Sequence, residues 1–145
     1  MNEKYMKIAI KEAEKAYKIG ELPVGCIIVE NDKILSKGYN KKEKNKNVLE
    51  HAELVAIKKT SKLKKDWRLN DCILYTTFEP CVMCMGAIIE CKIKHIVCGS
   101  INTKYHDINK KLCEENKISI EYNVNNETTN LMLKNFFNDI RNKLN

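Results

Sequence analysis

The sequence has no long apolar segment, no internal repeat and no low-complexity linker. None of its apolar runs approaches the ~18 residues that a membrane-spanning helix requires. The first helix-like segment, residues 2–19, alternates charged and apolar side chains and does not resemble a secretory signal. A chain of 145 residues is long enough for one domain with a substantial core. We therefore expect a single domain over residues 1–145 that is cytoplasmic and does not associate with membranes.

A disulfide framework is also not expected. The cysteines are odd in number and scattered, and most lie inside apolar segments: Cys26, Cys72, Cys81, Cys84, Cys91, Cys98 and Cys113. This pattern favours reduced cysteines, most of them packed as small hydrophobic side chains.

Acidic residues are fewer than basic ones, 19 against 26, which gives a formal net charge of +7 and a pI near 9.0. An excess of lysine favours a nucleic-acid partner. The chain is rich in both lysine and asparagine, however, and a biased genome composition would produce the same excess. Charge alone leaves both interpretations open.

Hydrophobic periodicity predicts helices and strands that alternate along the chain. We expect helices at 2–19, 51–63 and 81–91, strands at 24–30, 33–40, 72–78, 94–99 and 117–124, and a last helix after Asn126. Gly20 is a plausible C-terminal cap of the first helix, and Asn31-Asp32 is typical of a hairpin turn. Residues 100–116 are polar and ambiguous. Strands interleaved with helices predict an α/β fold, a three-layer α/β/α sandwich with a central mixed five-stranded sheet.

The segment "EPCVMC" places Cys81 and Cys84 three positions apart at the start of a predicted helix. Both sulfurs can then face one point, and the positive end of the helix favours thiolates, the form that binds metal. A second Cys-x-x-Cys is absent, so further ligands must come from elsewhere. His51 stands directly before another predicted helix, with Glu53 two residues on. Three ligands leave the fourth position of a zinc ion for water, as in catalytic sites.

The joint pattern His-x-Glu followed by Pro-Cys-x-x-Cys is the signature of the zinc-dependent nucleobase deaminases, in which the glutamate is the general acid and base and not a ligand. Two thiolates and a neutral imidazole leave zinc able to lower the pKa of its bound water toward roughly 7. A redox pair is a weaker interpretation, because nothing around the cysteines is thioredoxin-like. A structural zinc would not need Glu53.

Nearly the whole chain resembles the bacterial-type tRNA-specific adenosine deaminases. The similar segments are "LPVGCIIVENDKILSKGYN", "HAELVAI", "LYTTFEPCVMCMGAIIECKI" and "LKNFFNDIR". The resemblance implies a cytidine deaminase-like fold, one zinc ion (Zn2+) per chain held by His51, Cys81 and Cys84, and proton transfer by Glu53. It also implies deamination of adenosine to inosine at the wobble position of a tRNA anticodon, usually by a homodimer. Asn40 would then hydrogen-bond the target nucleotide, although an asparagine there can equally close a strand into a turn.

Residues after the fourth strand depart from the family pattern, because Asn102 stands where those enzymes have an acidic residue. We still expect Asn102 near the nucleotide, and Lys41 and Lys104 near the phosphates of an anticodon stem-loop. Related eukaryotic enzymes pair with a non-catalytic homologue, so a heterodimer is the alternative to a homodimer. The alternative activity is deamination of a free base or nucleotide: guanine, cytosine or deoxycytidylate. A non-catalytic RNA-binding role is disfavoured by the intact signature.

Overall fold

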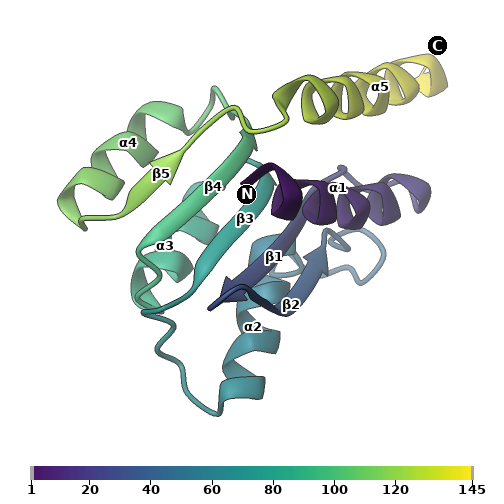
Figure 1. The fold of residues 1–145 in the computed structure, drawn as a ribbon. Coiled ribbons are helices and arrows are strands. Elements are labelled where there is room, and N and C mark those ends of the chain that lie inside the picture. Colours follow the sequence, from purple (N-terminus) through teal and green to yellow (C-terminus); the bar gives the residue numbers. More distant parts are fainter. Residues whose placement is uncertain (1, 145) are drawn as a thin grey trace.

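The computed structural model describes residues 2–144, in which five helices are interleaved with five strands (Figure 1). Along the chain they are α1 (Asn2–Lys18), β1 (Gly25–Glu30), β2 (Lys33–Tyr39), α2 (Ala52–Lys64), β3 (Ile73–Phe78), α3 (Val82–Glu90), β4 (His95–Ser100), α4 (His106–Glu115), β5 (Ser119–Glu121) and α5 (Asn126–Leu144). The strands form one sheet in the order β2-β1-β3-β4-β5. β1 pairs antiparallel with β2 and β3, whereas β3, β4 and β5 are parallel.

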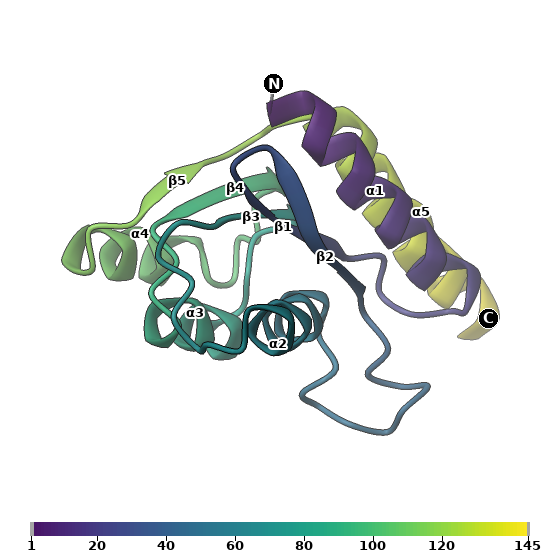
Figure 2. The same cartoon turned by 60° about the horizontal axis from the view of Figure 1, so that its bottom comes forward.

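Helices cover both faces of this sheet (Figure 2). α1 and α5 lie on one face, where Met6, Ile27 and Tyr75 are buried in one apolar cluster. α2, α3 and α4 lie on the other, where a larger cluster includes Leu74, Met85 and Ile96. The predicted three-layer α/β/α sandwich with a mixed five-stranded sheet is confirmed. None of the helices between residues 2 and 144 has the length and apolar character needed to span a bilayer.

Local signals in the sequence are confirmed at two turns. Asn31 and Asp32 both have positive φ, 49° and 61°, as a two-residue hairpin turn between β1 and β2 requires. Gly20 has φ 79° just after α1, and the backbone N–H of Glu21 donates to the carbonyl of Ala16 at 3.0 Å, which closes the helix end.

The C-terminal third differs more from the sequence pattern. Part of the ambiguous stretch 100–116 forms α4, and the predicted strand 117–124 is reduced to the three residues of β5, an edge strand paired only with the first half of β4. In α5 only Thr129 is fully buried, while Phe137 and Ile140 are 50% and 41% exposed. The apolar residues of α5 therefore contribute little to the core.

One glycine on the sheet sets where α2 begins. A Cβ at Gly38 in β2 would lie 2.6 Å from the carbonyl oxygen of Ala52 and 3.0 Å from the backbone nitrogen of Ala56. Only a residue without a side chain lets the first turn of α2 lie this close to the strand. The position of His51, directly before that turn, depends on this approach.

We predict that Gly38→Ala lowers the free energy of unfolding by about 1–3 kcal/mol, the usual effect of overpacking, because backbone atoms of α2 must move. Chemical denaturation measures the change. Gly86→Ala is the matched control: Gly86 lies in α3, and a Cβ there would have no other atom within 4 Å, so alanine should leave stability equal or slightly higher. Equal stabilities of both variants and the parent would contradict the packing argument.

Candidate metal centre and active site

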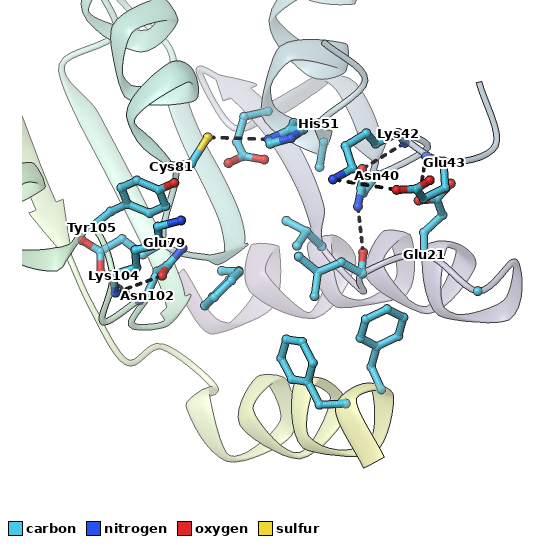
Figure 3. A pocket seen from close by; sticks show the side chains of 18 of the residues that line it. Glu21, Asn40, Lys42, Glu43, His51, Glu79, Cys81, Asn102, Lys104 and Tyr105 are labelled. Atoms are coloured by element: carbon cyan, nitrogen blue, oxygen red, sulfur yellow. Dashed lines mark hydrogen bonds and ion pairs between the residues drawn. The ribbon is translucent and has the colours of Figure 1, made fainter. Parts of the chain in front are cut away.

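The predicted site residues gather at one edge of the sheet, where β2, β3 and β4 end and β1 begins (Figure 3). The carboxyl ends of parallel strands are the usual location of ligand sites in α/β folds. Here the chain leaves β3 at Phe78 and reaches Cys81 directly before α3, while the connection after β2 leads to His51 at the start of α2.

His51 and Cys81 occupy the N-cap positions of α2 and α3, with extended backbones, yet neither side chain caps its helix. The two side chains face each other instead. His51 Nδ1 lies 3.6 Å from Cys81 Sγ and 3.5 Å from Cys84 Sγ, and potential ligand atoms of all three residues lie within 4.8 Å of one another. The structure therefore brings together the three residues predicted to bind zinc.

The side chains of this group differ in the direction in which their pKa values are shifted. The pKa of Cys81 is lowered to about 4, chiefly by a hydrogen bond from the Cys84 thiol and then by His51, while the pKa of Cys84 is raised by the same bond and by burial. The pKa of His51 is raised because its ring hydrogen-bonds to Cys81. Metal binding at such a group displaces these protons, so its affinity depends on pH.

The donor set fits zinc. One imidazole nitrogen and two thiol sulfurs, directed at one point, match the Cys₂His set of catalytic zinc sites. The first turns of two helices also point their N–H groups and positive dipole ends toward this point, which favours the thiolate form of the cysteines.

Glu53 lies beside this group in the first turn of α2 and is 4% exposed. Burial raises the pKa of its carboxyl from 4.5 to about 7. A group with a pKa near neutrality both accepts and donates a proton readily, which is the requirement for acid–base catalysis. Glu53 is outside the three-residue ligand group, so its role in proton transfer stays a prediction.

A pocket of about 560 Å³ opens above this group. Its polar lining includes Asn40, Lys42, His51, Glu53, Glu79, Cys81, Asn102 and Lys104, and its apolar lining includes Leu22, Val24, Phe78, Phe136, Phe137 and Ile140. Such a volume and mixture of side chains are typical of small-molecule sites. His51, Glu53 and Cys81 therefore border a space large enough for a nucleobase.

Asn40 and Asn102 both reach the pocket, and both also close turns. The Asn40 amide donates to the Leu22 carbonyl at 3.3 Å, and its oxygen accepts from the backbone N–H of Lys42 at 3.1 Å. The Asn102 oxygen accepts from the backbone N–H of Lys104 at 3.3 Å. Each asparagine therefore closes a turn. Both also line the pocket, and a contact with the bound nucleotide stays a prediction.

The two lysines predicted to lie near RNA phosphates differ in their position relative to the pocket. Lys104 lines the pocket, with its Nζ 5.3 Å from the centre of the Tyr105 ring. Lys41 is not among the lining residues, and its Nζ lies 5.0 Å from the centre of the Tyr39 ring. Its neighbour Lys42 takes the place at the pocket wall. The lysine-rich loop after β2 therefore reaches the pocket through Lys42 rather than through Lys41.

Sequence reasoning missed several other residues of the pocket lining. The buried acids Glu21 and Glu79, and the apolar side chains of α5, belong to the pocket lining. Glu79 stands inside the Glu-Pro-Cys segment, where the recognisable signal is the cysteine. The spacing of Phe136 and Phe137 indicates only an apolar face of a helix.

Comparison with known proteins places the site in a family. Residues 1–100 match the family model for the cytidine and deoxycytidylate deaminase zinc-binding region. The chain belongs to this family. The matched range contains His51, Glu53, Cys81 and Cys84.

Curated relatives at 37–42% identity are tRNA-specific adenosine deaminases, which confirms the resemblance seen in the sequence. The protein from Streptococcus pyogenes serotype M18 is 42% identical over 101 residues, which cover 70% of this chain and 64% of that protein. The protein from Rickettsia bellii is 37% identical over an alignment of 145 positions that covers 94% of this chain and 99% of that protein. The chain thus spans less than two-thirds of the length of the first relative and nearly all of the second.

Solved structures share the fold. One, from studies of A-to-I editing by tRNA:A34 deaminases, matches with a TM-score of 0.81 at 24% identity, covering 88% of this chain and 97% of that one. Guanine deaminase from Bacillus subtilis matches with a TM-score of 0.66 at 33% identity, covering 73% of this chain and 68% of that one. The predicted cytidine deaminase-like fold is confirmed.

We predict that Cys84→Ala abolishes stoichiometric zinc binding, because two ligands hold the ion far more weakly than three, and that it lowers stability in the presence of zinc. Elemental analysis of the purified variant measures the loss. Cys91→Ala is the control, since Cys91 is also buried but lies at the other end of α3, outside the ligand group. Full zinc in Cys84→Ala would contradict the assignment.

Proposed function

We propose that this protein hydrolyses adenosine to inosine at the wobble position of tRNA anticodons, with one zinc ion per chain bound by His51, Cys81 and Cys84. The observation that carries the proposal is the buried carboxylate of Glu53 beside the three-ligand group, at the base of a pocket of about 560 Å³. The tRNA-specific adenosine deaminases among the relatives support the choice of substrate.

Zinc held by two thiolates and an imidazole supplies Lewis acidity, which lowers the pKa of water toward about 7. The chain supplies the proton transfers. Glu53, with a pKa near 7, takes a proton from the attacking water and passes it to a ring nitrogen of the base. It then takes the second proton from the new hydroxyl group and passes it to the amino group, which leaves as ammonia.

The pocket walls supply binding. Asn40 and Asn102 offer amide groups, which both donate and accept hydrogen bonds. Lys42 and Lys104 lie at opposite sides of the pocket in Figure 3, where they attract the phosphates of a bound anticodon loop, with Lys41 contributing from outside the lining. A loop suits such a site because its bases are already unpaired, so that moving one into the pocket needs little energy.

We also propose a cytoplasmic homodimer. α3 presents Val82 to solvent with 48% of its surface exposed, beside the partly exposed Met83 and Ile89, next to the ligand-bearing turn. A second copy would cover these side chains, as a two-fold interface does. A non-catalytic homologue is the alternative partner. Sedimentation of a fully active monomer at micromolar concentration would refute the proposal.

Deamination of a free base is the second candidate. The likeness to a guanine deaminase at 33% identity favours it, and the same zinc group and Glu53 would serve either substrate. The two candidates differ in what surrounds the base. A free base needs no contacts to phosphates, whereas the tRNA proposal uses the lysines at the pocket rim.

We predict that Glu53→Ala lowers kcat by at least about 10²-fold, the lower end of the usual contribution of a positioned acid–base group. Zinc content and RNA affinity should remain, because the carboxylate acts only as the transition state forms. Steady-state kinetics, elemental analysis and RNA binding together make the measurement. Loss of zinc from this variant would make Glu53 a ligand and overturn its proposed role.

We predict that an anticodon stem-loop with adenosine at the wobble position yields inosine, that cytidine at that position reacts poorly, and that free adenosine is nearly inert, because the free nucleoside lacks the phosphates that the lysines attract. Inosine and ammonia are measured in parallel incubations with free guanine and cytosine. Efficient turnover of a free base, with no inosine in the stem-loop, would replace the tRNA proposal and leave the zinc chemistry intact.

A further inference from the structure

Two carboxylates at the pocket have no role in the chemistry proposed above. Glu21 and Glu79 are 2% and 1% exposed, so both are more deeply buried than Glu53. Burying a carboxylate is unfavourable unless other groups satisfy it. Among the described residues, the partners of both are backbone N–H groups, a histidine and an asparagine rather than a lysine or arginine side chain.

Glu21 holds the loop that follows β2. One of its carboxylate oxygens accepts the backbone N–H of Glu43 at 3.1 Å, and the other accepts that of Lys44 at 2.6 Å. Glu21 stands between the end of α1 and the pocket residue Leu22. It therefore fixes the start of the lysine-rich loop, including the wall residue Lys42, to the rigid end of α1.

Glu79 holds the opposite wall. Its Oε1 accepts the backbone N–H of Asn102 at 3.0 Å and lies 3.0 Å from His106 Nδ1, and its Oε2 accepts the Asn109 amide at 3.1 Å. Glu79 also precedes Pro80 and Cys81 in the chain. One side chain thus links the turn that carries a zinc ligand to the segment that carries Asn102 and Lys104.

The two arrangements are alike in their chemistry. Glu21 accepts two backbone N–H groups and Glu79 accepts one, in each case from a loop that brings a lysine and an asparagine to the pocket, and the two loops face each other in Figure 3. Hydrogen bonds to a charged acceptor are the stronger kind, so each loop is held firmly without a covalent link or regular secondary structure.

We propose that Glu21 and Glu79 are positioning residues that hold the two facing walls of the pocket at the spacing a bound nucleotide requires. Neither touches the reacting atoms. This inference rests on the proposed function for the identity of the nucleotide, an adenosine within RNA. It assigns to two buried acids a role in substrate binding that acts through the loops they hold.

The direction in which RNA binding changes when the carboxylate is removed distinguishes a positioning role from a purely electrostatic one. Removing a negative charge near a site for RNA should strengthen RNA binding if charge alone matters. Removing a carboxylate that holds a loop should weaken RNA binding, because the loop can then move to positions that do not fit the nucleotide. Glutamine is the suitable replacement, since it keeps the size of the side chain but turns one acceptor oxygen into a donor that faces an N–H.

The experiment compares Glu21→Gln and Glu79→Gln with Glu14→Gln, which removes the same charge from an exposed position on α1. For the stem-loop we expect KM to rise about tenfold in each pocket variant, the order expected for one lost hydrogen bond to a charged group, with kcat largely kept. Glu14→Gln should leave KM equal or lower. An unchanged or lower KM in both pocket variants would overturn the proposal, as would a fall in kcat and zinc content with no change in KM.

Amide hydrogen exchange tests the same two anchors without a measurement of activity. In Glu21→Gln the amides of Glu43 and Lys44 should exchange faster while that of Asn102 keeps its rate, and Glu79→Gln should show the reverse. If Glu79→Gln fails to fold, His106→Ala removes one donor to Glu79 from a partly exposed position, and should raise KM in the same direction. Parent protein that leaves the stem-loop unmodified refutes the proposed function, whereas unchanged exchange rates in both variants refute the anchors.

Discussion

The convergence of two helix starts on one point constrains the rest of this structure. An N-cap residue normally gives its side chain to the exposed N–H groups of its helix, and losing that bond costs about 1 kcal/mol. His51 and Cys81 both hold N-cap positions without capping, and turn toward each other instead. Two helices therefore begin less favourably than they could, and the free energy of metal binding offsets the loss. The sheet is arranged to make this possible, since Gly38 lets α2 approach β2 and the parallel pairing of β3 with β4 sets the line along which the chain enters α3.

Features that depend on neighbours in the chain could be predicted from the sequence. The hairpin at Asn31-Asp32 follows from two residues that tolerate positive φ, and the Cys81–Cys84 pair follows from a spacing of three positions at a helix start. That His51, thirty positions before Cys81, joins this pair was indicated by the signature of the nucleobase deaminases and not by local spacing. The buried acids could not be recognised in this way. Nothing near Glu21 in the sequence indicates that its partners are the backbone N–H groups of residues 43 and 44, because that contact depends on how α1 and the loop after β2 meet in space.

The C-terminal helix shows a different limit of sequence patterns. Periodicity in α5 correctly indicates a helix with apolar side chains on it, but periodicity does not say what those side chains will contact. In the fold, Thr129 near the start of α5 packs closely against Gly99 at the end of β4, and the rest of the helix extends past the sheet beside α1 (Figure 2). Phe136, Phe137 and Ile140 consequently border the pocket rather than the core. The same residues thus satisfy the helical pattern while providing a wall on which a base can stack.

Charge and position contribute differently to recognition at such a pocket. Lysines attract any polyanion over a distance and do not distinguish one base from another, because phosphates are the same at every position of the strand. Discrimination requires groups whose positions are closely fixed, and under the proposed function the amides of Asn40 and Asn102 at the pocket would be these groups. Both amides belong to loops, which are ordinarily mobile. A loop that carries recognition therefore needs an internal anchor, and a buried carboxylate that accepts backbone N–H groups supplies one without occupying the space where the nucleotide must bind. Under the proposed function, the net charge of +7 would attract an RNA over a distance, whereas Glu21 and Glu79 would hold the loops that carry these amides in place.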